Sequence, residues 1–155
     1  MSLDDDIRII ASAQLFDALQ AEQLRLLAFG VERLRFNQSR VIYREGDRAD
    51  CGFVVASGQV QISKTIDGTE KSLKIAQEGM VLGEMAMITE TTRLTNAIAL
   101  TDCELVRINR SLFRRILSEY PDIAAAIHSD LSIRLKDFLR EIAKLDRSFD
   151  NRSDL

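Results

Sequence analysis

Hydrophobic and polar positions follow three different patterns along this chain. Over residues 4–30 the apolar residues recur every three or four positions, which predicts helices that end near Gly30. Over residues 34–108, short runs of β-branched and aromatic residues alternate with turn residues, which predicts the short strands of a sandwich or barrel. Residues 111–146 return to helical spacing. The pattern therefore predicts a mainly β domain framed by helices.

The last of these segments predicts a short helix followed by a long one. Ser111 is a suitable N-cap for the first helix, and Pro121 marks the start of the second. Seven apolar residues then recur at the spacing of a coiled-coil seam: Ala124, Ile127, Leu131, Leu135, Phe138, Ile142 and Leu145. The apolar side chains of this seam must be buried against another surface. That surface is either a second copy of the chain, which gives a homodimer through residues 124–145, or the body of the domain itself. The residues after Leu145 are polar, so we expect the helix to end there.

The composition excludes several classes of function. A chain of 155 residues and 17.5 kDa suits one domain, residues 1–155, with a core of its own. Its one histidine (His128) and two cysteines supply too few ligands for a catalytic metal centre, so we expect no metal. The sequence supports neither a Ser-His-Asp nor a Cys-His arrangement. We therefore expect that the protein is not an enzyme.

Charge and hydropathy narrow the partners and the compartment. The net charge of −3 argues against a nucleic-acid-binding surface. No apolar run approaches the ~18 residues of a membrane span, and the acidic residues at 4–6 stand where a signal peptide would be basic. The isolated cysteines Cys51 and Cys103 form no disulfide framework. We expect a cytoplasmic protein that binds neither nucleic acid nor membrane.

One segment combines the residues that a phosphorylated sugar would need. Gly83 allows a ligand to approach the backbone, and a single helical turn from Glu84 to Ile88 would present free amide groups to a phosphate. Arg93 adds a permanently charged clamp for that phosphate, while ionised Glu84 would accept hydrogen bonds from sugar hydroxyls. Taken alone, this spacing also fits a strand turn with a surface Glu–Arg pair.

Further motifs accompany this segment in a fixed order. They are Glu-Gly-Asp at residues 45–47, Phe-Val-Val-Ala-Ser-Gly-Gln-Val at 53–60, Leu-Gly-Glu-Met-Ala-Met at 82–87, and the spacing from Arg93 through Pro121 to Arg134. Over nearly the whole chain the sequence resembles the cyclic-nucleotide-binding domain of the bacterial catabolite activator protein and of the regulatory subunits of cyclic-AMP-dependent kinase. The resemblance implies an α+β, mainly β fold: a double-stranded β-helix (jelly roll) with N-terminal helices and a long C-terminal helix.

The resemblance also implies a ligand site. By position, Glu84 would bind the ribose 2′-hydroxyl and Arg93 the cyclic phosphate, with help from the backbone amides near Met85 and Ala86. Ile62 and Leu73 stand where the family lines its purine pocket, although plain core residues would give the same pattern. The complete implied set is Ile62, Leu73, Gly83, Glu84, Met85, Ala86, Arg93, Leu94, Thr95, Arg134 and Phe138.

Three positions depart from the family pattern, and the first is Thr92, which precedes Arg93 where the family usually has proline. Leu94 follows Arg93 where the family has alanine, serine or threonine, so it offers an amide but no hydroxyl for a guanine amino group; this favours cyclic AMP over cyclic GMP. Thr95 would point to the opposite side from Leu94 in extended chain. Phe138 replaces a threonine of the activator protein that reaches the adenine amino group. It could stack on the base, or it could be a seam residue of a helix pair.

These expectations describe a cyclic AMP sensor that needs no further cofactor. It would signal through its long helix to a second copy or to an unidentified protein effector. The alternative is a structural or interaction module that keeps the fold without useful nucleotide affinity. Leu94 and Phe138 favour that alternative, whereas the presence of Gly83, Glu84 and Arg93 together argues against it.

Overall fold

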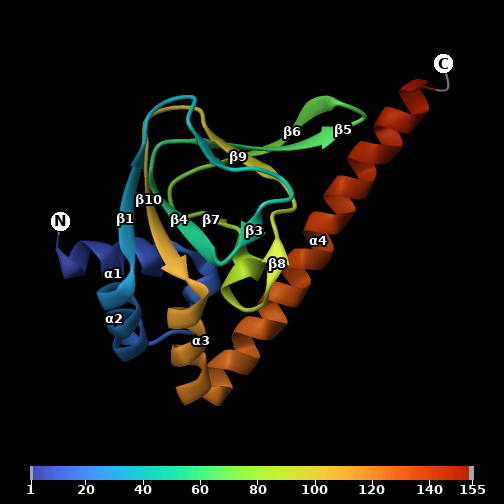
Figure 1. The fold of residues 1–155 in the computed structure, drawn as a ribbon. Helices are drawn as coiled ribbons and strands as arrows, with labels where there is room; N and C mark the ends of the chain where they lie inside the picture. Colours follow the sequence, from blue (N-terminus) through green and yellow to red (C-terminus); the bar gives the residue numbers. More distant parts are fainter. Residues whose placement is uncertain (1, 154–155) are drawn as a thin grey trace.

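The structure is a computed structural model that describes the backbone of residues 2–153 and the side chains of residues 2–145. Helices occupy both ends of the chain and strands its middle (Figure 1). The helical elements are α1 (Leu3–Ser12), the 3₁₀ turn η1 (Gln14–Phe16), α2 (Ala21–Gly30), the 3₁₀ turn η2 (Glu84–Met87), α3 (Arg110–Glu119) and α4 (Pro121–Ser153). The strands are β1 (Glu32–Phe36), β2 (Val41–Tyr43), β3 (Arg48–Ala49), β4 (Cys51–Ser57), β5 (Val60–Ile66), β6 (Thr69–Ala76), β7 (Val81–Leu82), β8 (Thr91–Thr92), β9 (Asn96–Ala99) and β10 (Cys103–Asn109).

The strands of the described residues form two four-stranded antiparallel sheets and one short ribbon. One sheet has the order β1-β10-β4-β7, the other has the order β2-β9-β5-β6, and the ribbon joins β3 to β8. Strands that are distant in sequence therefore pair, as in β1 with β10. The predicted fold class, a mainly β jelly roll with N-terminal helices and a long C-terminal helix, is confirmed.

The core consists of two apolar clusters that share β4. One cluster fills the inside of the barrel, and the other packs the outer face of β4 and β10 against the helices. Side chains alternate across a strand, so Phe53 and Val55 enter the barrel cluster while Val54 and Ala56 enter the helical one. Burial on both faces explains why β4 is an almost continuous apolar run.

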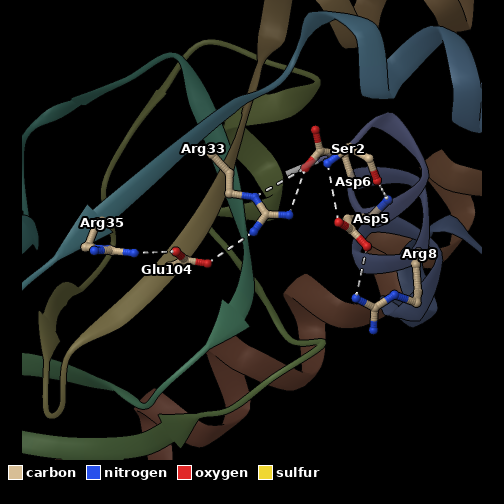
Figure 2. A network of polar contacts seen from close by, with 7 residues as sticks. All are labelled: Ser2, Asp5, Asp6, Arg8, Arg33, Arg35 and Glu104. Atoms are coloured by element: carbon tan, nitrogen blue, oxygen red, sulfur yellow. Dashed lines mark hydrogen bonds and ion pairs between the residues drawn. The ribbon is translucent and has the colours of Figure 1, made fainter.

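The N-terminal helix is held to the sheet by a charged network (Figure 2). Ser2 caps α1 by accepting a hydrogen bond from the amide of Asp5 at 3.2 Å. Arg33 of β1 then bridges Asp6 of α1 at 3.0 Å and Glu104 of β10 at 3.1 Å. Hydrogen bonding from Arg35 and the charge of Arg33 hold the pKa of Glu104 below its ordinary value. The network therefore fixes α1 against one end of the barrel.

The C-terminal helices differ from the sequence prediction at their ends. Asn109, not Ser111, occupies the N-cap position of α3, which begins at Arg110. The polar residues after Leu145 do not end α4, which continues to Ser153. A polar sequence can extend a helix already formed by packing, because propagation costs far less than nucleation.

Helix α4 uses part of its apolar seam within its own domain. Ile127 and Leu131 are buried in the helical cluster, and α4 contacts η1, η2 and α3. Figure 1 shows α4 running past β8 toward the side of the β5–β6 hairpin. The body of the domain therefore covers the first part of the seam. Among the described residues, no helix is long and apolar enough to cross a membrane.

Candidate ligand-binding site

A cavity of about 500 Å³ lies between the barrel and α4. Its floor comes from β7, η2 and β8, one wall comes from β5 and β6, and the opposite wall is α4. Apolar residues such as Phe138 line it together with six charged ones: Lys74, Glu84, Arg93, Arg134, Asp137 and Glu141. This volume lies within the range of small-molecule sites.

Gly83 shapes the backbone at the floor of the cavity. It adopts a left-handed conformation, with φ 67° and ψ 41°, immediately before η2. An added Cβ atom would overlap Nη1 of Arg93, so the arginine lies directly against this glycine. The amide of Ala86 donates a hydrogen bond to the carbonyl of Gly83 at 3.2 Å. The amides of Glu84 and Met85 come at the start of the 3₁₀ turn and therefore have no acceptor within it.

The Glu-Gly-Asp turn holds the backbone of Arg93. The amide of Arg93 donates to the carbonyl of Asp47 at 2.8 Å, and its carbonyl accepts from the amide of Gly46 at 2.9 Å. Asp47 also closes its own turn by accepting from the amide of Arg44 at 3.0 Å. The turn recognised in the sequence therefore fixes the strand from which Arg93 enters the cavity.

The side chain of Arg93 is buried and incompletely paired. Only 7% of the residue is exposed, and among the described residues its Nη1 atom has no hydrogen-bond partner. Glu84 forms its ion pair with Arg134, not with Arg93. The interpretation as a surface Glu–Arg pair is therefore wrong, and a donor-rich cation faces the cavity instead.

Glu84 lies at the other side of Gly83 and faces α4. Its carboxylate is 3.7 Å from Nη1 of Arg134, whose Nε donates to Asp130 one turn earlier at 2.9 Å. Burial raises the pKa of Glu84 above its ordinary value; the charges of Arg134 and Lys74 oppose this shift and that of Asp130 adds to it. Glu84 is therefore a hydrogen-bond acceptor when ionised, and its burial makes that ionised form less favourable than it is in water.

This raised pKa predicts a pH-dependent affinity for a ligand that donates hydroxyl groups to Glu84. Binding of such a ligand needs the carboxylate, so we expect the dissociation constant of cyclic AMP, the ligand that the sequence predicts, to rise as the pH falls from neutral toward 4.5, the ordinary pKa of the group. Because ionisation is disfavoured in the fold, Glu84 contributes less stability to the ligand-free protein as the pH rises through its raised pKa. Titration calorimetry in buffers of different protonation enthalpy should detect proton release on binding.

Glu84→Gln is the matched control for this prediction. It should bind cyclic AMP more weakly at neutral pH and lose the pH dependence over this range. An equal pH dependence in the wild type and in Glu84→Gln would assign the titration to another group.

The apolar end of the cavity differs from the prediction at one strand. Ile62 lines the cavity as expected, but Leu73 does not; it is half-buried and packs against the barrel cluster. A β-bulge explains the difference: Ile62 pairs with Lys74 and Ser63 pairs with Ser72, which leaves Leu73 as an extra residue. Lys74 therefore faces the cavity, and its Nζ lies 5.5 Å from the ring centre of Phe138 on α4.

The remaining predicted residues surround Arg93. Leu94 is 38% exposed and its carbonyl accepts from Nζ of Lys64 at 3.1 Å, while Thr95 is buried. Residues 94 and 95 form a bend, so they are not the extended chain for which opposite orientations of the two side chains were expected. Both residues line the cavity, together with Met85 and Ala86. Ten of the eleven predicted residues meet at one site, and Leu73 is the exception.

Sequence reasoning missed Lys74, Tyr43 and Cys51. Tyr43 and Cys51 contact the Arg93 guanidinium from β2 and β4, far from Arg93 in sequence. No local pattern marks them, because an apolar strand residue has the same spacing whether it packs on a leucine or on a guanidinium. Among the described residues no group of three or more His, Cys, Asp or Glu side chains could hold a metal ion.

Comparison with known proteins decides the family. Residues 33–120 match the family described as "Cyclic nucleotide-binding domain", and this range contains Gly83, Glu84 and Arg93. The chain belongs to the cyclic nucleotide-binding domain family. This is a family of ligand-binding regulatory domains, not of enzymes.

Solved structures of similar sequence share the fold. A cyclic nucleotide-binding-like protein from Brucella abortus is 46% identical with a TM-score of 0.67, and the match covers 74% of this chain and 99% of that one. The regulatory domain of Toxoplasma gondii PKA, crystallised with cAMP, is 28% identical with a TM-score of 0.70, and the match covers 74% of this chain and 44% of that one.

A longer relative contains a similar segment. Lysophospholipase nte1 of Aspergillus terreus is 28% identical over 136 residues, which is 86% of this chain and 9% of that protein. The cyclic nucleotide-binding domain described here thus spans less than a tenth of that relative.

Proposed function

We propose that the cavity binds cyclic AMP. Arg93 carries the proposal, because its buried guanidinium presents Nη1 at Gly83 with no partner among the described residues. A buried charged donor is costly unless an anion meets it. A cyclic phosphate supplies that anion, and the ribose attached to it brings a 2′-hydroxyl toward the carboxylate of Glu84.

The walls beyond Glu84 favour a purine. Ile62 and Leu82 offer apolar contacts from the barrel, and the ring of Phe138 offers a stacking surface from α4. Leu94 provides no hydroxyl for the 2-amino group of guanine, which favours cyclic AMP over cyclic GMP. The similarity to a PKA regulatory domain crystallised with cAMP supports the same choice.

Nucleotide binding would be communicated to a partner through a change in the arrangement of α4. Arg134 and Phe138 of this helix both line the cavity, so a bound nucleotide would contact α4 directly. Binding can shift α4 only by the difference in affinity between its two arrangements. The recipient would be a second copy along residues 124–145 or a cytoplasmic protein effector, and Ile133 and Leu139 are exposed apolar residues available to either.

Hydrogen exchange tests the site and the helix together. Saturating cyclic AMP should slow amide exchange in residues 83–95 and in residues 134–145 of α4, and cyclic GMP at equal concentration should do so less. Protection in residues 83–95 without any change in α4 would overturn signalling through the helix. Unchanged exchange in both segments would overturn nucleotide binding and favour an interaction module.

Sedimentation with and without cyclic AMP separates a homodimer from an effector complex, and a monomer in both states contradicts the dimer.

A further inference from the structure

The guanidinium of Arg93 lies in a cradle of uncharged groups from two strands. Its Cζ atom is 4.3 Å from the ring centre of Tyr43 and 5.8 Å from that of Phe53. The centres of these two rings are 6.2 Å apart, and their planes lie at 21° to each other. At the edge of the guanidinium, Nη2 donates a hydrogen bond to the sulfur of Cys51 at 3.3 Å. All three cradle residues are buried.

These neighbours leave the charge of Arg93 uncompensated. Burial raises the pKa of the Cys51 thiol and of the Tyr43 hydroxyl above their ordinary values, so both groups are neutral at physiological pH. Among the described residues, other arginines form ion pairs, such as Arg134 with Glu84, but Arg93 forms none. The cradle therefore holds the cation without neutralising it.

A planar cation needs two constraints to have a defined orientation. The face of the Tyr43 ring fixes the plane of the guanidinium, because a cation stacks over the ring face. The Cys51 sulfur fixes the rotation within that plane, because it accepts from Nη2 alone. Nη1 is then directed toward Gly83, where it has no partner among the described residues.

We propose that Tyr43 and Cys51 are positioning residues that preorganise Arg93 and thereby select which exocyclic oxygen of a cyclic phosphate Nη1 contacts. The inference rests on the proposed function and adds a stereochemical consequence to it. A fixed donor meets one of the two exocyclic oxygens in better geometry, whereas a rotating guanidinium would follow either. Tyr43 and Cys51 need not touch the nucleotide themselves.

The two phosphorothioate diastereomers of cyclic AMP test this selection. Each replaces one exocyclic oxygen with sulfur, a poorer acceptor, so the wild type should prefer one diastereomer over the other. Cys51→Val keeps the approximate size and removes the acceptor, so it should reduce the ratio of the two dissociation constants by roughly fivefold, the effect of one neutral hydrogen bond. Tyr43→Leu should reduce the same ratio.

Two variants control for changes in packing. Cys51→Ser restores an acceptor and should retain the wild-type ratio, and Cys103→Val, at a buried cysteine outside the cavity, should also retain it. Equal loss of affinity for both diastereomers in Cys51→Val and Tyr43→Leu would overturn the proposal, because it would show a structural role only.

A measurement on the ligand-free protein separates this inference from the proposed function. In ¹⁵N NMR of arginine side chains, the Arg93 resonances are identified by their loss in Arg93→Met. A held guanidinium should give separate Nη1 and Nη2 signals in the wild type and an averaged signal in Cys51→Val. Averaged signals in the wild type would overturn the positioning role. Separate signals in a wild type that binds no cyclic nucleotide would retain positioning and overturn the proposed function.

Discussion

Arg93→Met should weaken cyclic AMP binding by roughly 100-fold or more without unfolding the domain. Two charge-assisted hydrogen bonds to a phosphate, each of about 1.5–3 kcal/mol, account for an effect of this size. Methionine fills similar space between Tyr43 and Gly83 and removes a buried charge that lacks a partner at Nη1. We therefore expect the melting temperature of the ligand-free variant to equal or exceed that of the wild type.

The control for this prediction is an arginine outside the cavity. Arg8 lies on α1, its side chain is 74% exposed, and its contact with Asp5 is a surface pair at 3.6 Å. Arg8→Met should leave the dissociation constant unchanged in the same titration. Wild-type affinity in Arg93→Met would remove Arg93 from the binding site and with it the main support for the proposed function.

Gly83→Ala should abolish most of the affinity by a different route. An added methyl group would overlap Nη1 of Arg93, the flexible end of a side chain, which would have to move. Displacing this donor should raise the dissociation constant by roughly 10- to 100-fold, the equivalent of one charge-assisted hydrogen bond. Alanine is also strained in the left-handed backbone at φ 67°, which should lower the free energy of unfolding by about 1–2 kcal/mol.

Gly68→Ala separates the backbone cost from the clash. Gly68 also has a positive φ, 77°, but a Cβ atom there would meet nothing within 4 Å. Both variants should lose similar stability in thermal or denaturant unfolding, while only Gly83→Ala loses affinity. Equal affinity in the two variants would contradict the close approach of Arg93 to Gly83.

Local sequence signals predicted the elements that position the site. The Glu-Gly-Asp turn, Gly83 and the short turn after it have strong backbone preferences, so the local backbone of these segments could be anticipated. The resemblance to the family, not the helical spacing, predicted that Arg134 and Phe138 of α4 belong to the ligand site, and both line the cavity.

The contacts around these elements depend on pairing that periodicity does not encode. A bulge in β6 moves Leu73 off the cavity and brings Lys74 to it, and a two-residue period alone does not locate a bulge. Cys51 and Arg93 are 42 positions apart and meet because β3, just before Cys51, pairs with β8, just before Arg93. The continuation of α4 beyond Leu145 was also hidden, because its polar sequence resembles a frayed end.

Isothermal titration of cyclic AMP into the wild-type protein tests the central claim most directly. We expect saturable binding of one nucleotide per chain with a dissociation constant in the micromolar range or tighter, and weaker binding of 2′-deoxy cyclic AMP, which offers Glu84 no 2′-hydroxyl. Cyclic AMP at about 100 times its dissociation constant should then add about 2.7 kcal/mol to the free energy of unfolding. No heat with cyclic AMP or cyclic GMP, together with an unchanged melting temperature at millimolar nucleotide, would contradict the account.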